Sequence, residues 1–309
     1  MLPIEISHVT KRYGHEAAVS DLSFMAWPGR VTGFLGPNGA GKSTTMKILL
    51  DLASADGGRA TIGGTRYRDL RDPARVVGVV LEPDAFHPGR TGRNHLRVLA
   101  DGIGVPPARV DELLELVGLG HAADRHAGAY SLGMRQRLGL AAALLGDPPV
   151  LVLDEPGNGL DPQGIRWLRD LLRARSVKGH TVFVSSHLLA EVEHLADDVV
   201  VINRGRLITA GALAQLQQAG ISVRTPSPEP LTRILQAAGG VVDARGNGAL
   251  LVRGLSTAEI GNHACAAGIA LHELAARSGS LEELFLSWTG NETPAGLSET
   301  GKEKEVVGQ

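Results

Sequence analysis

The sequence predicts an α/β fold with a mainly parallel sheet, and three observations support this prediction. Short apolar runs, at residues 31–35, 76–81 and 150–153, are typical of buried strands. Segments with the periodicity of helices separate these runs. The first run also leads directly into GPNGAGKS (residues 36–43), a full match to the GxxxxGK[ST] phosphate-binding loop, and a helical segment follows it.

This loop predicts a nucleotide phosphate site. Gly36, Gly39 and Gly41 can take positive φ and carry no Cβ, so successive backbone N–H groups can converge on phosphate oxygens at a helix N-terminus. We expect the Lys42 ammonium to reach the β- and γ-phosphates and the Ser43 hydroxyl to ligate Mg²⁺. A glycine-rich turn with an incidental lysine is the plainer alternative, and the flanking strand and helix argue against it.

Length and composition limit the protein's class. A chain of 309 residues allows a large domain and a smaller one. The net charge of −2 gives no indication of the basic surface that nucleic-acid-binding proteins carry. Cys265 is the single cysteine, which fits a reducing compartment, and we expect it to be a small buried residue. No signal peptide is visible, and no run reaches the ~18 apolar residues of a membrane helix. Work at a membrane would therefore require a partner.

The first elements are strand-like. Residues 4–9 alternate between apolar and polar side chains, as in a half-buried strand. Residues 11–14 read as a turn, and residues 18–24 read as a second strand. Tyr13, in this turn, could stack on an adenine ring, but packing on its own sheet is equally consistent with its position.

Acidic and polar residues follow the later apolar runs. Glu82 follows residues 76–81, where it could contact Mg²⁺ or its waters, or could simply end a solvated strand. Asp154 and Glu155 close the next run: the first suits Mg²⁺ coordination and the second suits polarising a water that attacks the γ-phosphate. His187 follows residues 181–186, where its imidazole could donate to a terminal phosphate oxygen or lie exposed at a helix start.

Residues 91–145 have helical periodicity. Within them, Ser131 reads as a helix N-cap, which would bring its hydroxyl and the N–H groups near Gly133 to the positive end of a helix dipole. The cap alone does not predict a phosphate site, because most capped helices bind nothing. Near residues 216–225 the composition changes, and prolines at 226, 228 and 230 mark a boundary. We expect a small α+β domain over residues 216–289 and a disordered tail over residues 290–309.

Taken in order, these elements resemble the nucleotide-binding subunit of ATP-binding cassette (ABC) transporters over about residues 4–215. The resemblance implies a P-loop NTPase cassette, with a RecA-like core sheet, an antiparallel β subdomain and a helical signature subdomain at about residues 88–145. It implies a cassette over residues 1–215, followed by the small C-terminal domain.

The resemblance also implies roles for individual residues. Tyr13 would stack on adenine, Glu155 would be the catalytic base and His187 the switch histidine. Two cassettes would close head to tail, so that Ser131 and Gly133 of one chain cap the γ-phosphate held by Lys42 of the other. The expected metal contacts are Ser43, Glu82 and Asp154. The expected nucleotide contacts are Tyr13, Gly36, Pro37, Asn38, Gly39, Ala40, Gly41, Lys42, Ser43, Thr44, Ser131, Gly133 and Asp161 of the D-loop.

Two residues depart from the family pattern. Leu132 replaces the usual glycine of the signature and adds bulk near the partner's phosphate. Glu82 replaces the usual glutamine, which is similar to exporters of the lantibiotic- and bacitracin-resistance type. This places a negative charge near Mg²⁺ and would alter coupling between hydrolysis and the membrane subunit.

The function implied is that of a cytoplasmic ATPase that binds ATP and Mg²⁺. It would pair with an identical or related cassette and lie on the inner face of the cell membrane through a separate integral permease. Export of an antibiotic or peptide-like compound is the expected role. An importer ATPase, a non-transport soluble ATPase of the same family and a P-loop kinase are the alternatives. Nucleic acid is not an expected partner.

Overall fold

The computed structural model describes residues 1–82, 85–217, 220–245, 248–277, 281–282 and 285, and the tail expected at 290–309 lies outside them. A six-stranded sheet is the centre of the N-terminal unit (residues 4–216), with strand order β5-β6-β7-β3-β8-β9. All neighbours are parallel except β8 and β9. Its strands are β3 (Val31–Leu35), β5 (Val77–Val80), β6 (Val150–Asp154), β7 (Thr181–Ser186), β8 (Asp198–Asn203) and β9 (Arg206–Ala212).

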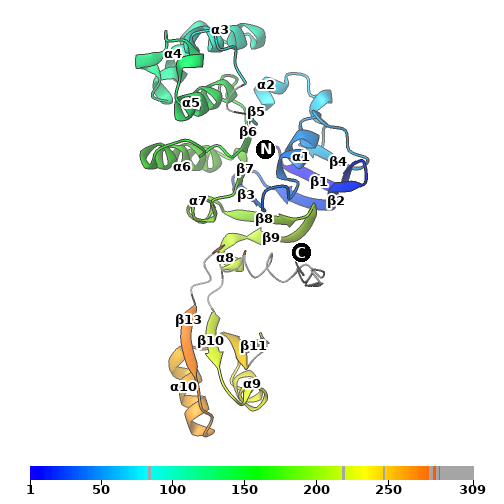
Figure 1. The fold of residues 1–309 in the computed structure, drawn as a ribbon, viewed down its shortest axis with the longest axis vertical. Coiled ribbons are helices and arrows are strands. Elements are labelled where there is room, and N and C mark those ends of the chain that lie inside the picture. Colours follow the sequence, from blue (N-terminus) through cyan, green and yellow to red (C-terminus); the bar gives the residue numbers. More distant parts are fainter. Residues whose placement is uncertain (83–84, 218–219, 246–247, 278–280, 283–284, 286–309) are drawn as a thin grey trace, which may run out of the picture.

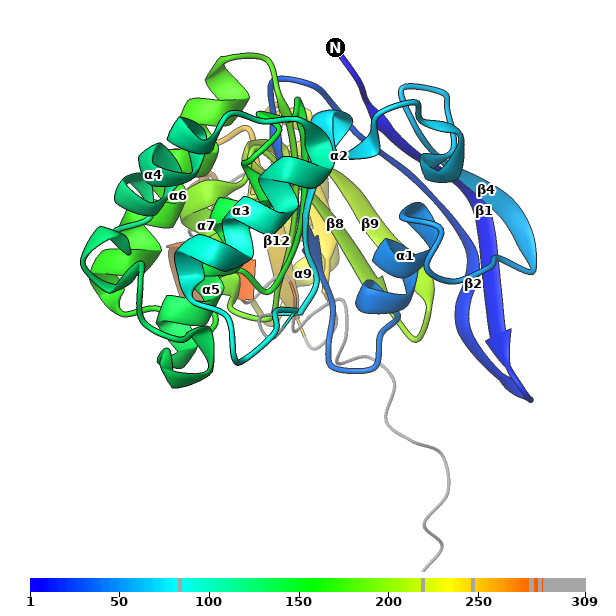
Figure 2. The same cartoon turned by 90° about the horizontal axis from the view of Figure 1, so that it is seen from above.

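Helices cover both faces of this sheet, which explains why its inner strands are apolar without alternation. Helices α6 and α7 lie on one face and α1 on the other (Figures 1 and 2). The helices around this sheet are α1 (Lys42–Leu49), α2 (Pro73–Val76), α6 (Pro162–Val177), α7 (Leu189–Leu195) and α8 (Leu213–Leu216). Because β3, β6 and β7 are parallel neighbours, their carboxyl ends meet at one edge of the sheet, where ligands of α/β sheets bind.

A three-stranded antiparallel sheet, in the order β2-β1-β4, packs over α1. Its strands are β1 (Ile4–Tyr13), β2 (Glu16–Ala26) and β4 (Gly57–Ile62). Phe24 of this sheet contacts Phe34 and Phe183 of the central sheet, with ring centroids 5.3 and 5.7 Å away. This shared core fixes the start of α1 against the strands that surround it.

A helical part follows β5 and covers the end of the sheet (Figure 1). It contains α3 (Gly92–Ile103), α4 (Pro107–Leu116), α5 (Leu132–Ala143) and the short 3₁₀ turns η2 (Gly120–Ala122) and η3 (Ala127–Ala129), whereas η1 (Tyr67–Asp69) precedes β5. Helix α5 packs so closely on β5 that a Cβ on Gly78 would collide with the carbonyl of Ala143. The helical part is thus packed firmly on the edge strand of the sheet.

The C-terminal unit (residues 220–277) has a sheet and an apolar core of its own. The elements are β10 (Gly220–Arg224), α9 (Pro228–Ala237), β11 (Val241–Ala244), β12 (Ala249–Arg253), α10 (Thr257–Ala266) and β13 (Glu273–Arg277). Their order along the chain and the strand order β11-β12-β10-β13 make a split β-α-β arrangement. The prolines expected at a domain boundary instead join β10 to α9, and Pro228 is the first residue of α9.

Three further details differ from the sequence predictions. Strand β1 continues through Tyr13, so this residue ends a strand and the turn follows it. Helix α1 ends earlier than the helical pattern suggests, because Asp51 takes a φ of 54°. The expectation that Cys265 is buried is wrong: its neighbour Ala264 faces the core, and Cys265 is exposed.

Among the described residues, no helix combines the length and apolar character needed to cross a bilayer.

Candidate functional site

The glycine-rich loop leaves β3 and enters α1. Gly41 has a φ of 103°, and a Cβ there would collide with the carbonyl of Ala18. A Cβ on Gly36 would lie 2.5 Å from the carbonyl oxygen of Ile202. Glycine is therefore required at both positions, and the loop folds closely over the start of α1. The first N–H groups of this helix and its dipole make the loop an anion-binding end.

Lys42 is nearly buried in this loop, with 7% of its surface exposed. Its Nζ donates to the carbonyl oxygens of Gly36 at 2.6 Å and Pro37 at 3.3 Å. Burial lowers the pKa of Lys42, and the negative charges of Glu155 and Asp154 oppose that shift. A phosphate in the loop would offer this ammonium a charged acceptor in place of two neutral carbonyls.

Asp154 joins the loop to the end of β6. Its Oδ2 accepts a hydrogen bond of 2.7 Å from the Ser43 hydroxyl, and its other oxygen accepts from the Ser185 hydroxyl. A hydroxyl and a carboxylate in contact fit Mg²⁺, which prefers oxygen ligands. Ser43 and Asp154 would hold this ion, which supplies positive charge beside the phosphates. The described residues contain no cluster of three or more His, Cys, Asp or Glu side chains that could hold a metal.

Glu155 and His187 form a contacting pair beside Asp154. Glu155 has a φ of 49°, and its N–H donates to the Ser185 hydroxyl at 3.0 Å. Its Oε2 lies 2.7 Å from His187 Nδ1 and accepts from the His187 backbone N–H at 3.3 Å. The carboxylate is 22% exposed and held in one direction, as a group that orients or deprotonates an attacking water must be.

Sequence reasoning missed two residues behind this pair. Ser185 lies opposite Asp154 in the register of β6 and β7, and its hydroxyl donates to the Asp154 carboxylate and accepts from the Glu155 backbone N–H. The signal in the sequence that could have identified Ser185 is a hydroxyl residue at the end of a buried strand. Glu191, on α7, lies against Gly157. Burial and the charge of Glu155 raise the pKa of Glu191, and His187 opposes the shift.

Glu82 lies apart from these contacts. Its side chain is 72% exposed, and its Oε1 lies 3.9 Å from Lys47 Nζ. Lys47 is on α1, one turn beyond Ser43. The hydrogen bonds of Ser43 and Asp154 therefore form without this carboxylate.

The signature segment forms a second group of predicted residues. Ser131 caps α5 by accepting from the Met134 N–H at 3.3 Å, and Asp161 caps α6 by accepting from the Gly164 N–H at 2.8 Å. Leu132, which is 48% exposed, lies against Gly159 of the same chain. Helices α5 and α1 lie apart in both views (Figures 1 and 2). The loop at the start of α1 and the signature segment at the start of α5 therefore lie at separate places in one chain.

Thr44 and Tyr13 are two further residues that are expected to contact the nucleotide. Thr44 follows Ser43 in α1 and is half-buried. Tyr13 is 56% exposed at the end of β1, and Lys11 Nζ lies 5.3 Å from its ring centroid. Its ring is therefore available to a planar partner, and the Lys11 contact does not cover it fully.

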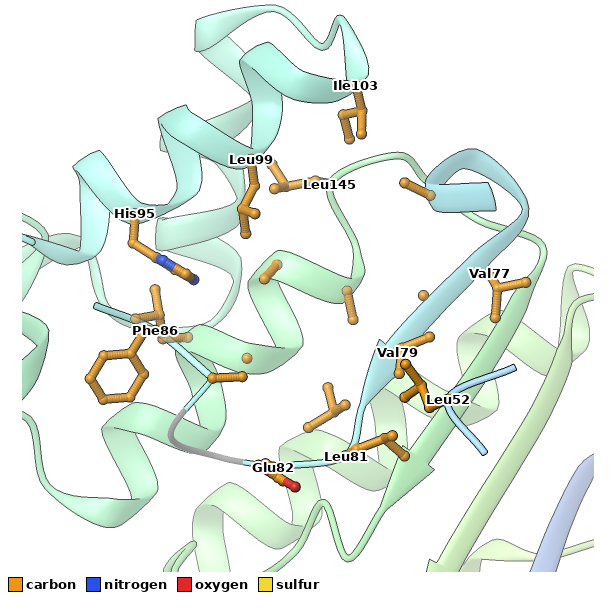
Figure 3. Close-up of a pocket in the computed structure, with 18 of the residues that line it drawn as sticks. Leu52, Val77, Val79, Leu81, Glu82, Phe86, His95, Leu99, Ile103 and Leu145 are labelled. Carbon is orange, nitrogen blue, oxygen red and sulfur yellow. The ribbon is translucent and has the colours of Figure 1, made fainter. Parts of the chain in front are cut away.

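A pocket of about 500 Å³ lies between β5, α3 and α5 (Figure 3). Apolar side chains, including Leu52, Leu81 and Leu99, line it, and Glu82 lies at its edge (Figure 3). His95, 7% exposed, lies in its wall next to Phe86, and its buried Nδ1 has no hydrogen-bond partner among the residues that the structure describes. Burial and the charge of Arg90 lower the pKa of His95, which favours the neutral ring.

Comparison with known proteins agrees with this geometry. Residues 19–158 match the family model described as "ABC transporter", and residues 219–282 match a domain of unknown function. The chain is 41% identical to the bacitracin transport ATP-binding protein BcrA of Bacillus licheniformis, over 66% of this chain and 68% of that protein. It is 39% identical to the lantibiotic transport ATP-binding protein SrtF of Streptococcus pyogenes, over 66% and 89%.

A solved structure of an ATP-binding subunit of an ABC transporter has the same fold. It aligns with a TM-score of 0.64 and 29% identity, over 69% of this chain and 91% of that chain. The phosphate loop and the paired acids are the parts that such a subunit requires to bind and hydrolyse ATP. The chain therefore belongs to the ABC transporter family, as an ATP-binding subunit with ATP hydrolase activity.

Proposed function

We propose that this subunit powers the export of an antibiotic or peptide-like compound through a separate membrane permease. The single observation that carries the substrate class is the likeness to the bacitracin and lantibiotic transport proteins, because it extends over most of the N-terminal unit. Glu82, at the position usually held by glutamine, agrees with this assignment. The chain would lie at the cytoplasmic face of the membrane, held there by the permease.

Two cassettes would pair around two molecules of Mg-ATP. The separation of the loop and the signature segment in one chain supports this part of the proposal. Ser131 and Gly133 lie at the N-terminal end of α5, where the helix dipole favours an anion. Helix α5 lies apart from α1, the helix that begins at Lys42 (Figure 1). A second cassette, identical or related, would bring its own signature segment to this loop. Tyr13, Asp161 and Thr44 would add contacts around the nucleotide.

Hydrolysis would follow from the groups held around Asp154. Lys42 and the loop N–H groups would bind the phosphates, and Ser43 and Asp154 would hold Mg²⁺. Glu155 would accept the proton of the attacking water, and His187 would fix the direction of the Glu155 carboxylate while contacting the γ-phosphate. Catalysis would then come mainly from positioning and from stabilisation of charge.

The permease would dock over the pocket between β5, α3 and α5. The apolar lining and exposed Leu52 and Leu99 suit an apolar side chain from a partner helix. The pocket also borders Glu82, so that docking there would reach the strand end that adjoins the ATP site.

Affinity-tagged Glu155→Gln, purified from detergent-solubilised membranes with and without Mg-ATP, tests this proposal. We expect a multi-span membrane protein to co-purify. Leu99→Glu should lose this partner and still bind ATP, whereas Leu116→Glu, at an exposed leucine of α4 outside the pocket, should retain it. Recovery of soluble partners alone would refute the transport role. Retention of the membrane protein by Leu99→Glu would refute only the docking site.

A further inference from the structure

Helix α7 connects the hydrolysis site to the rest of the chain. It begins two residues after His187, and the Leu188 N–H donates to the Ser186 hydroxyl at 3.0 Å. Val192 of α7 packs so closely on β3 that a Cβ on Gly33 would collide with it. The contact with β3 holds α7 against the sheet, and a displacement of α7 would change the position of His187, which precedes it in the chain.

Glu193, on the same helix, holds both ends of the segment that forms the C-terminal unit. Gln217 is the last described residue before the C-terminal unit, and Leu281, the first described residue after it, packs again on the N-terminal unit. Glu193 Oε1 accepts from the Gln217 side-chain amide and from the Leu281 backbone N–H, the latter at 3.3 Å. One carboxylate oxygen thus ties the exit and the return of the chain to α7.

Apolar packing strengthens this attachment. Leu281 is fully buried in a cluster with Val192, Val199 and Leu213. The C-terminal unit, in contrast, packs around a separate core of its own. A body with its own core can move as a unit, and here it is joined to the N-terminal unit at the helix that follows His187.

We propose that Glu193 is a positioning residue for His187: it couples the orientation of the C-terminal unit to α7, and through α7 to the hydrogen bond between His187 and Glu155. The C-terminal unit would then control the rate of ATP hydrolysis. This inference depends on the family's ATPase activity and not on the identity of the exported compound.

Steady-state hydrolysis by the full-length chain provides the first test. Glu193→Ala removes the shared acceptor, and we expect kcat to fall about threefold to tenfold while the KM for Mg-ATP changes less than about twofold, because the phosphate loop is untouched. Glu193→Gln keeps an acceptor oxygen and should restore most of the rate. Glu229→Ala, at an exposed glutamate of α9, is the matched control and should behave as wild type.

A fluorophore on Cys265 provides the second test, because this is the single cysteine and it is exposed on α10. If Glu193 fixes the C-terminal unit, Glu193→Ala should lower the fluorescence anisotropy and Glu193→Gln should not. Thermal unfolding would verify that each variant is folded. Unchanged anisotropy in Glu193→Ala would refute the attachment. Lower anisotropy with an unchanged kcat would refute the coupling to His187.

Discussion

His187 Nδ1 and Glu155 Oε2 lie 2.7 Å apart, at the ends of two neighbouring parallel strands. The backbone N–H of His187 approaches the same oxygen at 3.3 Å. Two donors on one carboxylate oxygen restrict its direction and leave the other oxygen for a water. The function of Glu155 should therefore depend on its charge more than on its shape.

Glu155→Gln should reduce kcat for ATP hydrolysis by about 10²- to 10⁴-fold, the usual contribution of a general base. ATP binding should persist, because Lys42 and the phosphate loop remain intact. Hydrolysis rates and equilibrium binding of ATP would be measured on the same preparation, with Glu229→Gln as control. A rate near that of wild type would exclude Glu155 as the base.

Ser185→Ala should lower both stability and activity. The hydroxyl contacts Asp154 and the N–H of Glu155, and Ser185 is fully buried, so its loss leaves polar groups without a partner. We expect a loss of about 1–3 kcal/mol in the free energy of unfolding and a clear reduction in kcat. Denaturant titration and hydrolysis assays test this. Ser176→Ala, at a buried serine of α6 remote from the acids, should retain kcat.

Leu132→Gly should alter hydrolysis through the loop that follows Glu155. The Leu132 side chain lies on Gly159, where a Cβ would be 2.5 Å from Leu132 Cγ, so this leucine supports the loop of its own chain. Without that support the loop should be less ordered, and we expect kcat to fall while ATP affinity is maintained. Leu116→Gly controls for glycine in a helix. An increase in kcat would instead indicate that Leu132 obstructs the partner's phosphate.

The sequence was sufficient to predict the central sheet and the polar residues that follow its strands. Glycine spacing and unbroken apolar runs are local signals, so the loop at Gly36 and the strand before Asp154 could be identified without a structure. Contacts across the chain could not be identified in this way. The hydroxyl of Ser185 and the carboxylate of Glu193 acquire their partners only from strand register and from the return of the chain at Leu281.

His95 should make stability depend on pH. Burial and Arg90 lower its pKa in the folded state, below the value of about 6.5 for an unfolded histidine. Below pH ~6.5 the unfolded chain therefore binds more protons, and stability decreases as pH falls. We expect His95→Leu to show a shallower decrease between about pH 7.5 and 5.5. Urea titrations across this range test it, and identical slopes would contradict the assignment.

Glu82→Gln should separate hydrolysis from its coupling to the permease. The Glu82 carboxylate is largely exposed, 3.9 Å from Lys47, and the contact between Ser43 and Asp154 forms without it. Because exposed ion pairs contribute little, ATP binding and basal hydrolysis should remain within about twofold of wild type. The carboxylate also borders the pocket where we place the permease, so stimulation of hydrolysis by the reconstituted permease should change. Loss of nucleotide binding would instead show that Glu82 contacts the metal directly, and unchanged stimulation would show that it takes no part in coupling.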